Sequence, residues 1–421
     1  MRKHLRRLPP FLLVLFLVLA MAGDTVNRGG LLGPSKPFVY SVVAWEVKSF
    51  PKKWTYAFTH LFSRPSQTQK IAEVRRYFAL TDQINQKGYQ LQRAKLGADA
   101  ADPQALAVTL EQLEKERTGL NGRVEVTLEE MISGAMREQG LSRRFFFWKV
   151  TWPPVDFKLS SLPNVIALSP RDRIELLTAR LLRPDMSTAE LNAVEAAYTR
   201  MGYSSVIEDI GGVATYPSLV NGSASLQEAL HLGAHEWMHH YLFFQPLGQH
   251  YWDNGRMTAI NETTADLVGV EIGRQLYRKY FATPEELAPP PARPRPPVPD
   301  PSAPPPFSFT REMRTTRLQA EALLKEGKVD AAEAYMRERS RFLAEHGYVI
   351  PVLNQAYFAF HGSYTESAES GSVNPLGGQI RGLRTGSTSV GAFVQRMQKV
   401  TSHQEFLKQV VPAPTGTREG A

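Results

Sequence analysis

The residues of this 421-residue chain that could do chemistry are concentrated in one segment, His235-Glu236-Trp237-Met238-His239. Two histidines four residues apart lie on the same face of a helix, where both imidazole rings can bind one ion. Zinc accepts imidazole nitrogen at about 2.0–2.1 Å, and a catalytic zinc site leaves one position for water. Glu236 follows the first histidine and can take a proton from that water. The spacing therefore predicts two Zn2+ ligands, His235 and His239, and a general base, Glu236.

The surrounding residues favour a metal-binding helix over a chance motif. With ten histidines in the chain, this five-residue pattern arises by chance in roughly one such chain in a hundred. The flanking positions are apolar, which predicts a largely buried helix, and buried ionisable groups need a partner or a metal. These apolar positions are Leu230, Leu232, Ala234, Met238 and Leu242.

A third ligand is expected from the next predicted helix, which begins near Met257 and carries Asn261-Glu262-Thr263-Thr264-Ala265-Asp266. Glu262 is the leading candidate. Asp266 lies one turn further along the same face, where it can accept a hydrogen bond from the free ring nitrogen of a liganding histidine and fix its orientation. The alternative is that both acids belong to an ordinary exposed stripe.

Two more histidines lie on the same predicted helix as the motif. His240 points about 100° away from His239 and is not expected to bind the metal. His231 is one turn before His235 and shares its face; we expect it to pack or to line the cleft.

The two motifs together, HEWMH followed by NETTAD, resemble those of the gluzincin metallopeptidases, the thermolysin-like and aminopeptidase-like zinc enzymes. The resemblance covers about 35 residues and implies a peptide or protein substrate. It also implies Zn2+ bound by His235, His239 and Glu262, with Glu236 as base and Asp266 orienting His235. Asn261 matches the family's residue before the third ligand.

A weaker pattern near the C-terminus, from Asn354 to Tyr364, resembles the last part of uncharacterised bacterial aminopeptidase-like proteins. Peptide hydrolysis also needs a group that stabilises the developing oxyanion. The resemblance to the gluzincins implies that this group is a Tyr or His outside the two motifs. We expect Tyr364 or His361, with Tyr357 and Tyr348 as competitors. For each, a packed aromatic ring is the alternative. Before the motif helix, residues 213–216 are expected either to pair with extended substrate or to be a structural strand.

The first residues predict export. A basic stretch from Arg2 to Arg7 precedes an apolar run, residues 11–22, that ends in a small-x-small cleavage pattern. The run is shorter than the roughly 20 residues that span a bilayer. We expect residues 1–22 to be a signal peptide; the alternative is an uncleaved anchor through residues 11–22, with membrane association. Both predict an exported (extracellular, cell-envelope or periplasmic) protein.

The composition excludes several other chemistries. The chain has no cysteine, so disulfides, thiol nucleophiles and cysteine zinc ligands are ruled out. The formal net charge is +8, but residues 1–22 contribute four of these charges. Residues 201–282, which contain the candidate site, include eight acidic and four basic residues, so the basic character of the chain lies mainly outside the site. No basic-aromatic module or nucleotide-binding glycine loop is present, so no nucleic-acid partner is predicted.

The predicted fold class is α+β and mainly helical, with a zincin-like catalytic domain that contains a small mixed sheet. Helical periodicity, interrupted at residues 97–103, predicts a hairpin within a helical region, 36–142. The catalytic core is expected at 143–288. Eleven prolines mark 289–308 as a loop or linker. A C-terminal helical subdomain, 309–412, is expected to complete the cleft.

Among the finer predictions are a helix at 186–201 that begins with a capping box, Ser187 with Glu190, a strand at 212–220, a helix at 350–362 and a loop at 363–389. The favoured function is zinc-dependent hydrolysis of peptide bonds. The alternative is a catalytically silent, zinc-binding exported scaffold or assembly protein. The motifs do not distinguish endopeptidase from aminopeptidase action. They also do not predict the oligomeric state.

Overall fold

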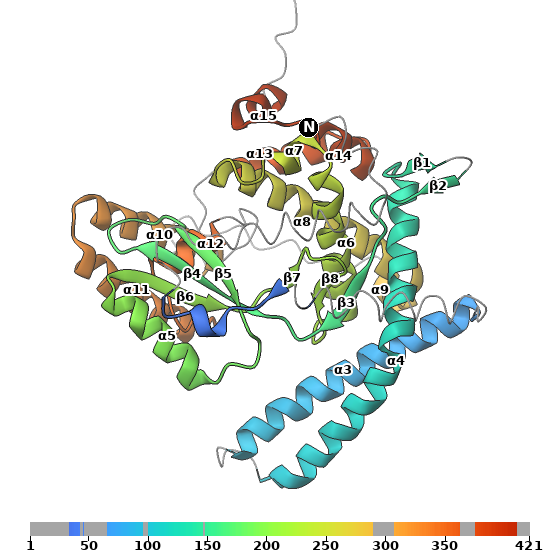
Figure 1. Ribbon diagram of the computed structural model, residues 1–421, viewed down its shortest axis with the longest axis horizontal. Helices are drawn as coiled ribbons and strands as arrows, with labels where there is room; N and C mark the ends of the chain where they lie inside the picture. The colour runs from blue at the N-terminus through green and yellow to red at the C-terminus, as the bar shows by residue number, and fades with distance from the viewer. Residues whose placement is uncertain are drawn as a thin grey trace, which may run out of the picture.

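The computed structural model describes residues 33–42, 45, 65–95, 100–145, 148–288, 307–362 and 375–410. Within them the chain is mainly helical with a small mixed sheet, as predicted (Figure 1). No helix in these ranges is both long and apolar enough to cross a membrane. The predicted signal peptide or anchor, the proline stretch 289–306 and Tyr364 lie outside the described residues.

The predicted helical hairpin is confirmed as α3 (Gln67–Lys95) and α4 (Pro103–Glu138). Asp102 caps α4 by accepting a hydrogen bond from the amide of Gln104, and Pro103 occupies the first turn, where no amide hydrogen is needed. Part of the hairpin packs into the main core, and its other end extends away from the body (Figure 1).

The mixed sheet is built from β3 (Phe157–Ser160), β8 (Ser218–Asn221) and β7 (Gly212–Val213). The central strand β8 pairs in parallel with β3 and antiparallel with β7. A short antiparallel ladder, β1 (Arg143–Phe145) and β2 (Trp148–Val150), lies outside this sheet. The mixed sheet matters for function because β7 and β8 contact the motif helix.

A second, antiparallel sheet has the order β5 (Thr178–Leu182), β4 (Asn164–Pro170), β6 (Tyr203–Glu208). Successive residues of β4 face opposite sides. Val165 and Ala167 pack in a core with α10 (Phe309–Lys325), α11 (Val329–Glu345) and α12 (Gln355–His361). Ile166 and Leu168 pack against α5 (Thr188–Arg200), whose predicted capping box, Ser187 with Glu190, is confirmed.

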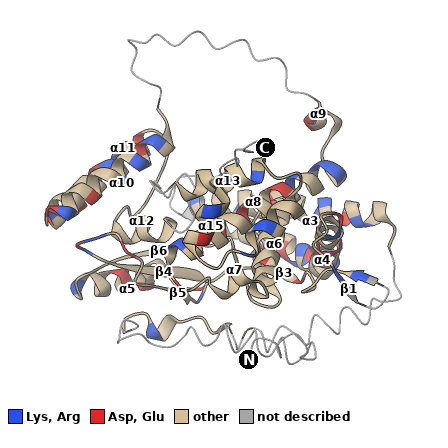
Figure 2. Cartoon of the chain, turned by 90° about the horizontal axis from the view of Figure 1, so that it is seen from above, with Lys and Arg blue, Asp and Glu red and all other residues tan. Residues whose placement is uncertain are grey.

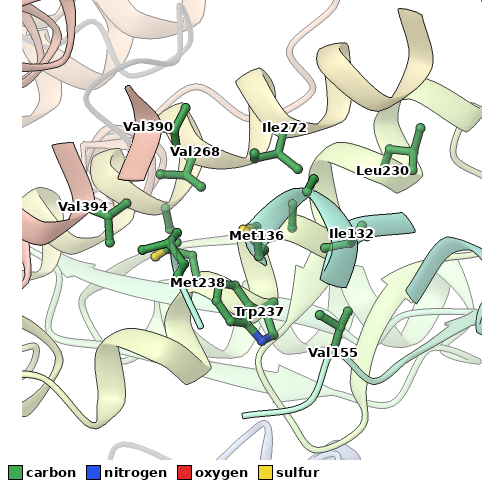
Figure 3. Packing of buried hydrophobic residues seen from close by; sticks show 14 of the residues in the cluster. Ile132, Met136, Val155, Leu230, Trp237, Met238, Val268, Ile272, Val390 and Val394 are labelled. Carbon is green, nitrogen blue, oxygen red and sulfur yellow. The ribbon is translucent and has the colours of Figure 1, made fainter. Parts of the chain in front are cut away.

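The centre of the molecule is the helix pair α6 (Leu226–Phe243) and α8 (Gly255–Tyr280). In Figure 3, Trp237 and Met238 of α6 lie among Met136 of α4, Val268 of α8 and Val394 of α14. The remaining helices are α7 (Pro246–Gln249), α9 (Pro284–Leu287), α13 (Leu376–Thr385), α14 (Val390–Met397) and α15 (His403–Val410).

Three finer predictions were wrong. The strand expected within 212–220 is divided into β7 and β8, and Pro217, which has no amide hydrogen for a ladder, precedes the second part. The helix expected at 350–362 begins only at Gln355, capped by Asn354. The loop expected at 363–389 contains α13, whose buried Leu376, Ile380 and Leu383 recur at helical spacing and outweigh its three glycines.

The C-terminal region, predicted as one subdomain over 309–412, divides between two cores. Helices α10–α12 cover the antiparallel sheet. Helices α13–α15 belong to the main core around α6 and α8. In Figure 1 these two groups lie on different sides of the α6–α8 pair.

Candidate metal centre

The ligand-bearing helices begin at well-defined caps. The Ser225 hydroxyl accepts from the amide of Glu228 at the start of α6. The Asn254 side chain accepts from the first amides of α8. On the core side of α6, the Trp237 indole donates to the Pro153 carbonyl at 2.7 Å, which fixes the rotation of the helix. The histidines consequently face α8.

Two glycines of α8 let the helices meet backbone to backbone. A Cβ on Gly269 would lie 2.8 Å from the carbonyl oxygen of His231, and a Cβ on Gly273 would lie 2.8 Å from the amide nitrogen of the same residue. Real Cβ atoms do not approach backbone that closely, so any side chain here would force α6 and α8 apart. The close approach is what allows a carboxylate of α8 to reach the histidines.

We therefore expect Gly273→Ala to destabilise the protein. The added methyl group should cost about 1–3 kcal/mol, the range for overpacking a closely packed contact. Chemical denaturation measures the change. Gly255→Ala is the matched control, because Gly255 begins the same helix with no atom near its Cβ position. Equal stability of the two variants would contradict the backbone contact.

The three predicted ligands converge. The Nε2 atoms of His235 and His239 are 3.0 Å apart, and Oε2 of Glu262 lies 3.7 and 3.4 Å from them. Tetrahedral ligands about 2.0–2.1 Å from zinc are about 3.3–3.4 Å from one another, so these separations suit one small ion. Glu262 is only 5% exposed, which argues against the exposed-stripe alternative. Sites with these donors, two imidazoles and a carboxylate, fit Zn2+.

The partners of the ligand rings differ in part from the prediction. Nδ1 of His239 lies 3.0 Å from Oδ1 of Asn261, the residue before Glu262. Asp266, predicted to orient His235, instead has its Oδ1 3.0 Å from Nε2 of His231. His231 therefore pairs with an acid rather than merely packing. Nδ1 of His235 is buried with no hydrogen-bond partner among the described residues.

Burial and mutual charge shift the titration of these groups. Burial disfavours the charged form of His239, but Glu262 outweighs it and raises the pKa of His239 to about 9. Burial, reinforced by His239, lowers the pKa of His235. Burial opposes ionisation of Glu262 too, yet the two histidines hold its pKa at about 2. Without an ion, a proton on His239 balances Glu262; a metal ion must displace that proton, so binding should weaken progressively as the pH falls below about 9.

The predicted base lies beside the ligands. Without an ion, burial raises the pKa of Glu236 to about 8; a cation bound beside it would lower that pKa and favour the carboxylate that a general base requires. A Cβ on Gly212 of β7 would lie 2.3 Å from Oε1 of Glu236. The glycine thus leaves the space that the base occupies. The sequence had placed a strand here, and the structure gives that strand direct contact with the base.

His240 takes no part in the ligand cluster, as predicted. It is buried near Tyr216, with 5.5 Å between ring centroids. Burial and the neighbouring His239 lower the pKa of His240 to about 4, against the opposing effect of the Ala214 and Thr215 backbone. It is a neutral core histidine.

Tyr251 is the site residue that the motifs did not reveal. Its hydroxyl donates to Oε1 of Glu262, and its ring meets that of His239 edge to face, 6.2 Å between centroids. The Thr258 hydroxyl donates to the carbonyl of Tyr251 at 2.8 Å and fixes the loop between α7 and α8. No spacing rule marks this position; only its place just before the second ligand helix could have suggested it.

The oxyanion candidates that the structure describes, His361, Tyr357 and Tyr348, have their ring contacts outside the ligand cluster. His361 ends α12, where its ring packs 4.3 Å from that of Tyr357 and its Nε2 is 3.9 Å from Glu208. Tyr357 belongs to the core over the antiparallel sheet. Tyr348 stacks on Phe309, 4.3 Å between centroids. The last two fit the packed-aromatic alternative.

Comparisons of the chain with protein-family models, curated proteins and solved structures gave no match.

Proposed function

We propose that this chain is a zinc-dependent peptidase of the gluzincin type, with a zincin-like catalytic domain centred on α6 and α8. The observation that carries the proposal is the convergence of His235, His239 and Glu262 at separations that suit one zinc ion. A buried carboxyl group, Glu236, with its pKa raised to about 8, lies next to them.

The positions of the side chains indicate the chemical role of each group. Zn2+, when bound, supplies a Lewis acid that activates water and polarises a carbonyl group. Glu236 accepts the proton of the attacking water and later returns it to the leaving amine. Asn261 holds the ring of His239 through its outer nitrogen. Burial of these groups strengthens their interactions with developing charge.

We assign the stabilisation of the developing oxyanion to the hydroxyl of Tyr251. It is a donor within the buried cluster, and its present acceptor is Oε1 of Glu262. The neighbouring Trp252, 74% exposed, packs on the Tyr251 ring with 4.4 Å between centroids. The pair lies in the loop that leads into α8, so an exposed aromatic side chain adjoins the buried cluster.

Tyr251→Phe is accordingly expected to lower kcat by about 10²–10³-fold, the usual effect of losing one oxyanion donor. Zinc content and kcat should be measured in the same samples, with Tyr348→Phe as the control, because the Tyr348 ring stacks on Phe309 rather than on a ligand residue. If Tyr251 acts only by holding Glu262, zinc affinity falls instead and saturating zinc restores kcat. Full kcat with full zinc would return the role to His361 or Tyr364.

The proposed substrate is a peptide or protein outside the cytoplasm. The enzyme would reach it after residues 1–22 direct its export. The alternative, a catalytically silent zinc-binding scaffold, is disfavoured by the intact base. Loss of Glu236 would be the simplest route to such a protein. Metal analysis of the purified chain together with cleavage of a mixed peptide library tests the proposal directly.

A further inference from the structure

A groove outside the metal centre lies between α5, the start of β6, α11 and the start of α12. Its volume is about 580 Å³, within the range of sites that bind small molecules. None of the metal-centre residues lines it. In Figure 1 its elements belong to the part of the molecule built on the antiparallel sheet, away from α6 and α8.

One wall of the groove presents two arginines that form no hydrogen bond or close ion pair among the described residues, although Arg337 is near enough to Glu333 to help lower the pKa of that carboxyl group. Arg337 and Arg341 are four residues apart on α11 and so project from one face of the helix. Both are exposed. Arg171, which also lines the groove, is by contrast engaged by Glu333 at 2.8 Å and Asp330 at 3.2 Å. Basic residues, interspersed with acidic ones, recur along this helix in Figure 2.

The other surfaces of the groove supply acceptors. Glu195 of α5 is half-buried and uses Oε1 to accept from the amide of Ile207 at 3.0 Å. Burial raises the pKa of Glu195, which a cation nearby would reverse. Gln355 is fully buried; its Nε2 donates to the Arg171 carbonyl at 2.6 Å, while its Oε1 has no partner in the described part of the chain.

We propose that this groove binds a short peptide with free ends. Its terminal carboxylate is held by Arg337 and Arg341, and its amino group faces Glu195. Two guanidinium groups suit a carboxylate because each offers paired donors in a planar fork. An inorganic anion would use the arginines alone and would offer no donor to Glu195 or to Oε1 of Gln355. The binding itself is independent of the proposed function, although peptide hydrolysis would generate ligands of this chemistry.

The test uses the full chain carrying Glu236→Gln, so that no probe is cut, and measures binding by calorimetry. Triglycine is expected to bind. Triglycine amide, which lacks the carboxylate, acetyl-triglycine, which lacks the ammonium group, and inorganic phosphate should each bind at least ten-fold more weakly. Adding Arg337→Gln and Arg341→Gln should weaken triglycine binding at least ten-fold. Arg314→Gln, an exposed arginine of α10 outside the groove, is the matched control and should change nothing.

A second variant tests the groove without altering charge. Ala196 is an exposed groove residue of α5, and Ala196→Phe should fill the space and weaken triglycine at least ten-fold. Triglycine binding that survives both the arginine pair and Ala196→Phe would place the peptide elsewhere, the metal centre included, and overturn the proposal. Phosphate binding as tight as triglycine would show a simple anion site and overturn the peptide assignment. Absence of triglycine binding would do so as well.

Discussion

Glu236→Gln is expected to abolish peptide hydrolysis while zinc stays bound. Glutamine keeps the size and hydrogen-bonding shape of the side chain but accepts no proton at neutral pH. General base catalysis contributes about 10²–10⁴-fold, so a loss of about 10³-fold or more is expected. The three converging ligand atoms belong to other residues, so the zinc content should be unchanged. Cleavage of a mixed peptide library and metal analysis of the same preparation measure both quantities.

The matched control is Glu228→Gln, an exposed glutamate in the first turn of the same helix. It should retain both activity and zinc. An unchanged cleavage rate in Glu236→Gln would remove Glu236 from the mechanism and with it the peptidase assignment. Zinc bound by an unmutated chain that cleaves no peptide in the library would favour the scaffold alternative.

Glu262→Ala should lower the affinity for zinc by more than about 100-fold, because loss of a partner behind a ligand alone costs about 10–100-fold. The substitution removes a ligand and also the charge that balances a proton on His239. Glu262 holds the pKa of His239 at about 9 against the lowering effect of burial, so this pKa should fall in the variant. Titration with a competing zinc chelator measures the affinity.

Glu271→Ala is the companion variant on the same helix. Glu271 pairs with Arg384 at 2.7 Å, outside the ligand cluster, so its loss should leave zinc affinity unchanged. Normal zinc occupancy in Glu262→Ala would refute Glu262 as the third ligand. Equal losses in both variants would point to general damage to α8 rather than to coordination.

The convergence of His235, His239 and Glu262 could be predicted from the sequence because helical spacing is a local property. Four residues separate His235 from His239, and that spacing alone puts both rings on one face. Glu262 followed from its place on the next helix. The hairpin and the α5 capping box were predicted for the same reason, because helix caps and hydrophobic periodicity depend on residues that are close in sequence.

What escaped prediction depends on packing between distant segments. The partner of Asp266 is His231 because the two glycines of α8 bring that part of α6 against it. Tyr251 reaches Glu262 from a loop whose path no periodicity defines. The groove joins α5 with α11, elements more than a hundred residues apart, so no pattern local in sequence could indicate it. In each case the sequence shows which residues are present but not which residues they contact in the fold.

The closeness of α6 and α8 along the chain has a kinetic consequence. Only residues 244–254, which include the short helix α7, separate the helix with two ligands from the helix with the third. Closing such a short connection costs little chain entropy, and contacts local in sequence form early during folding. We therefore expect the ligand pocket to assemble before the antiparallel sheet has recruited α10–α12 from beyond residue 306. An ion captured at that stage would act as a folding nucleus for the rest of the chain.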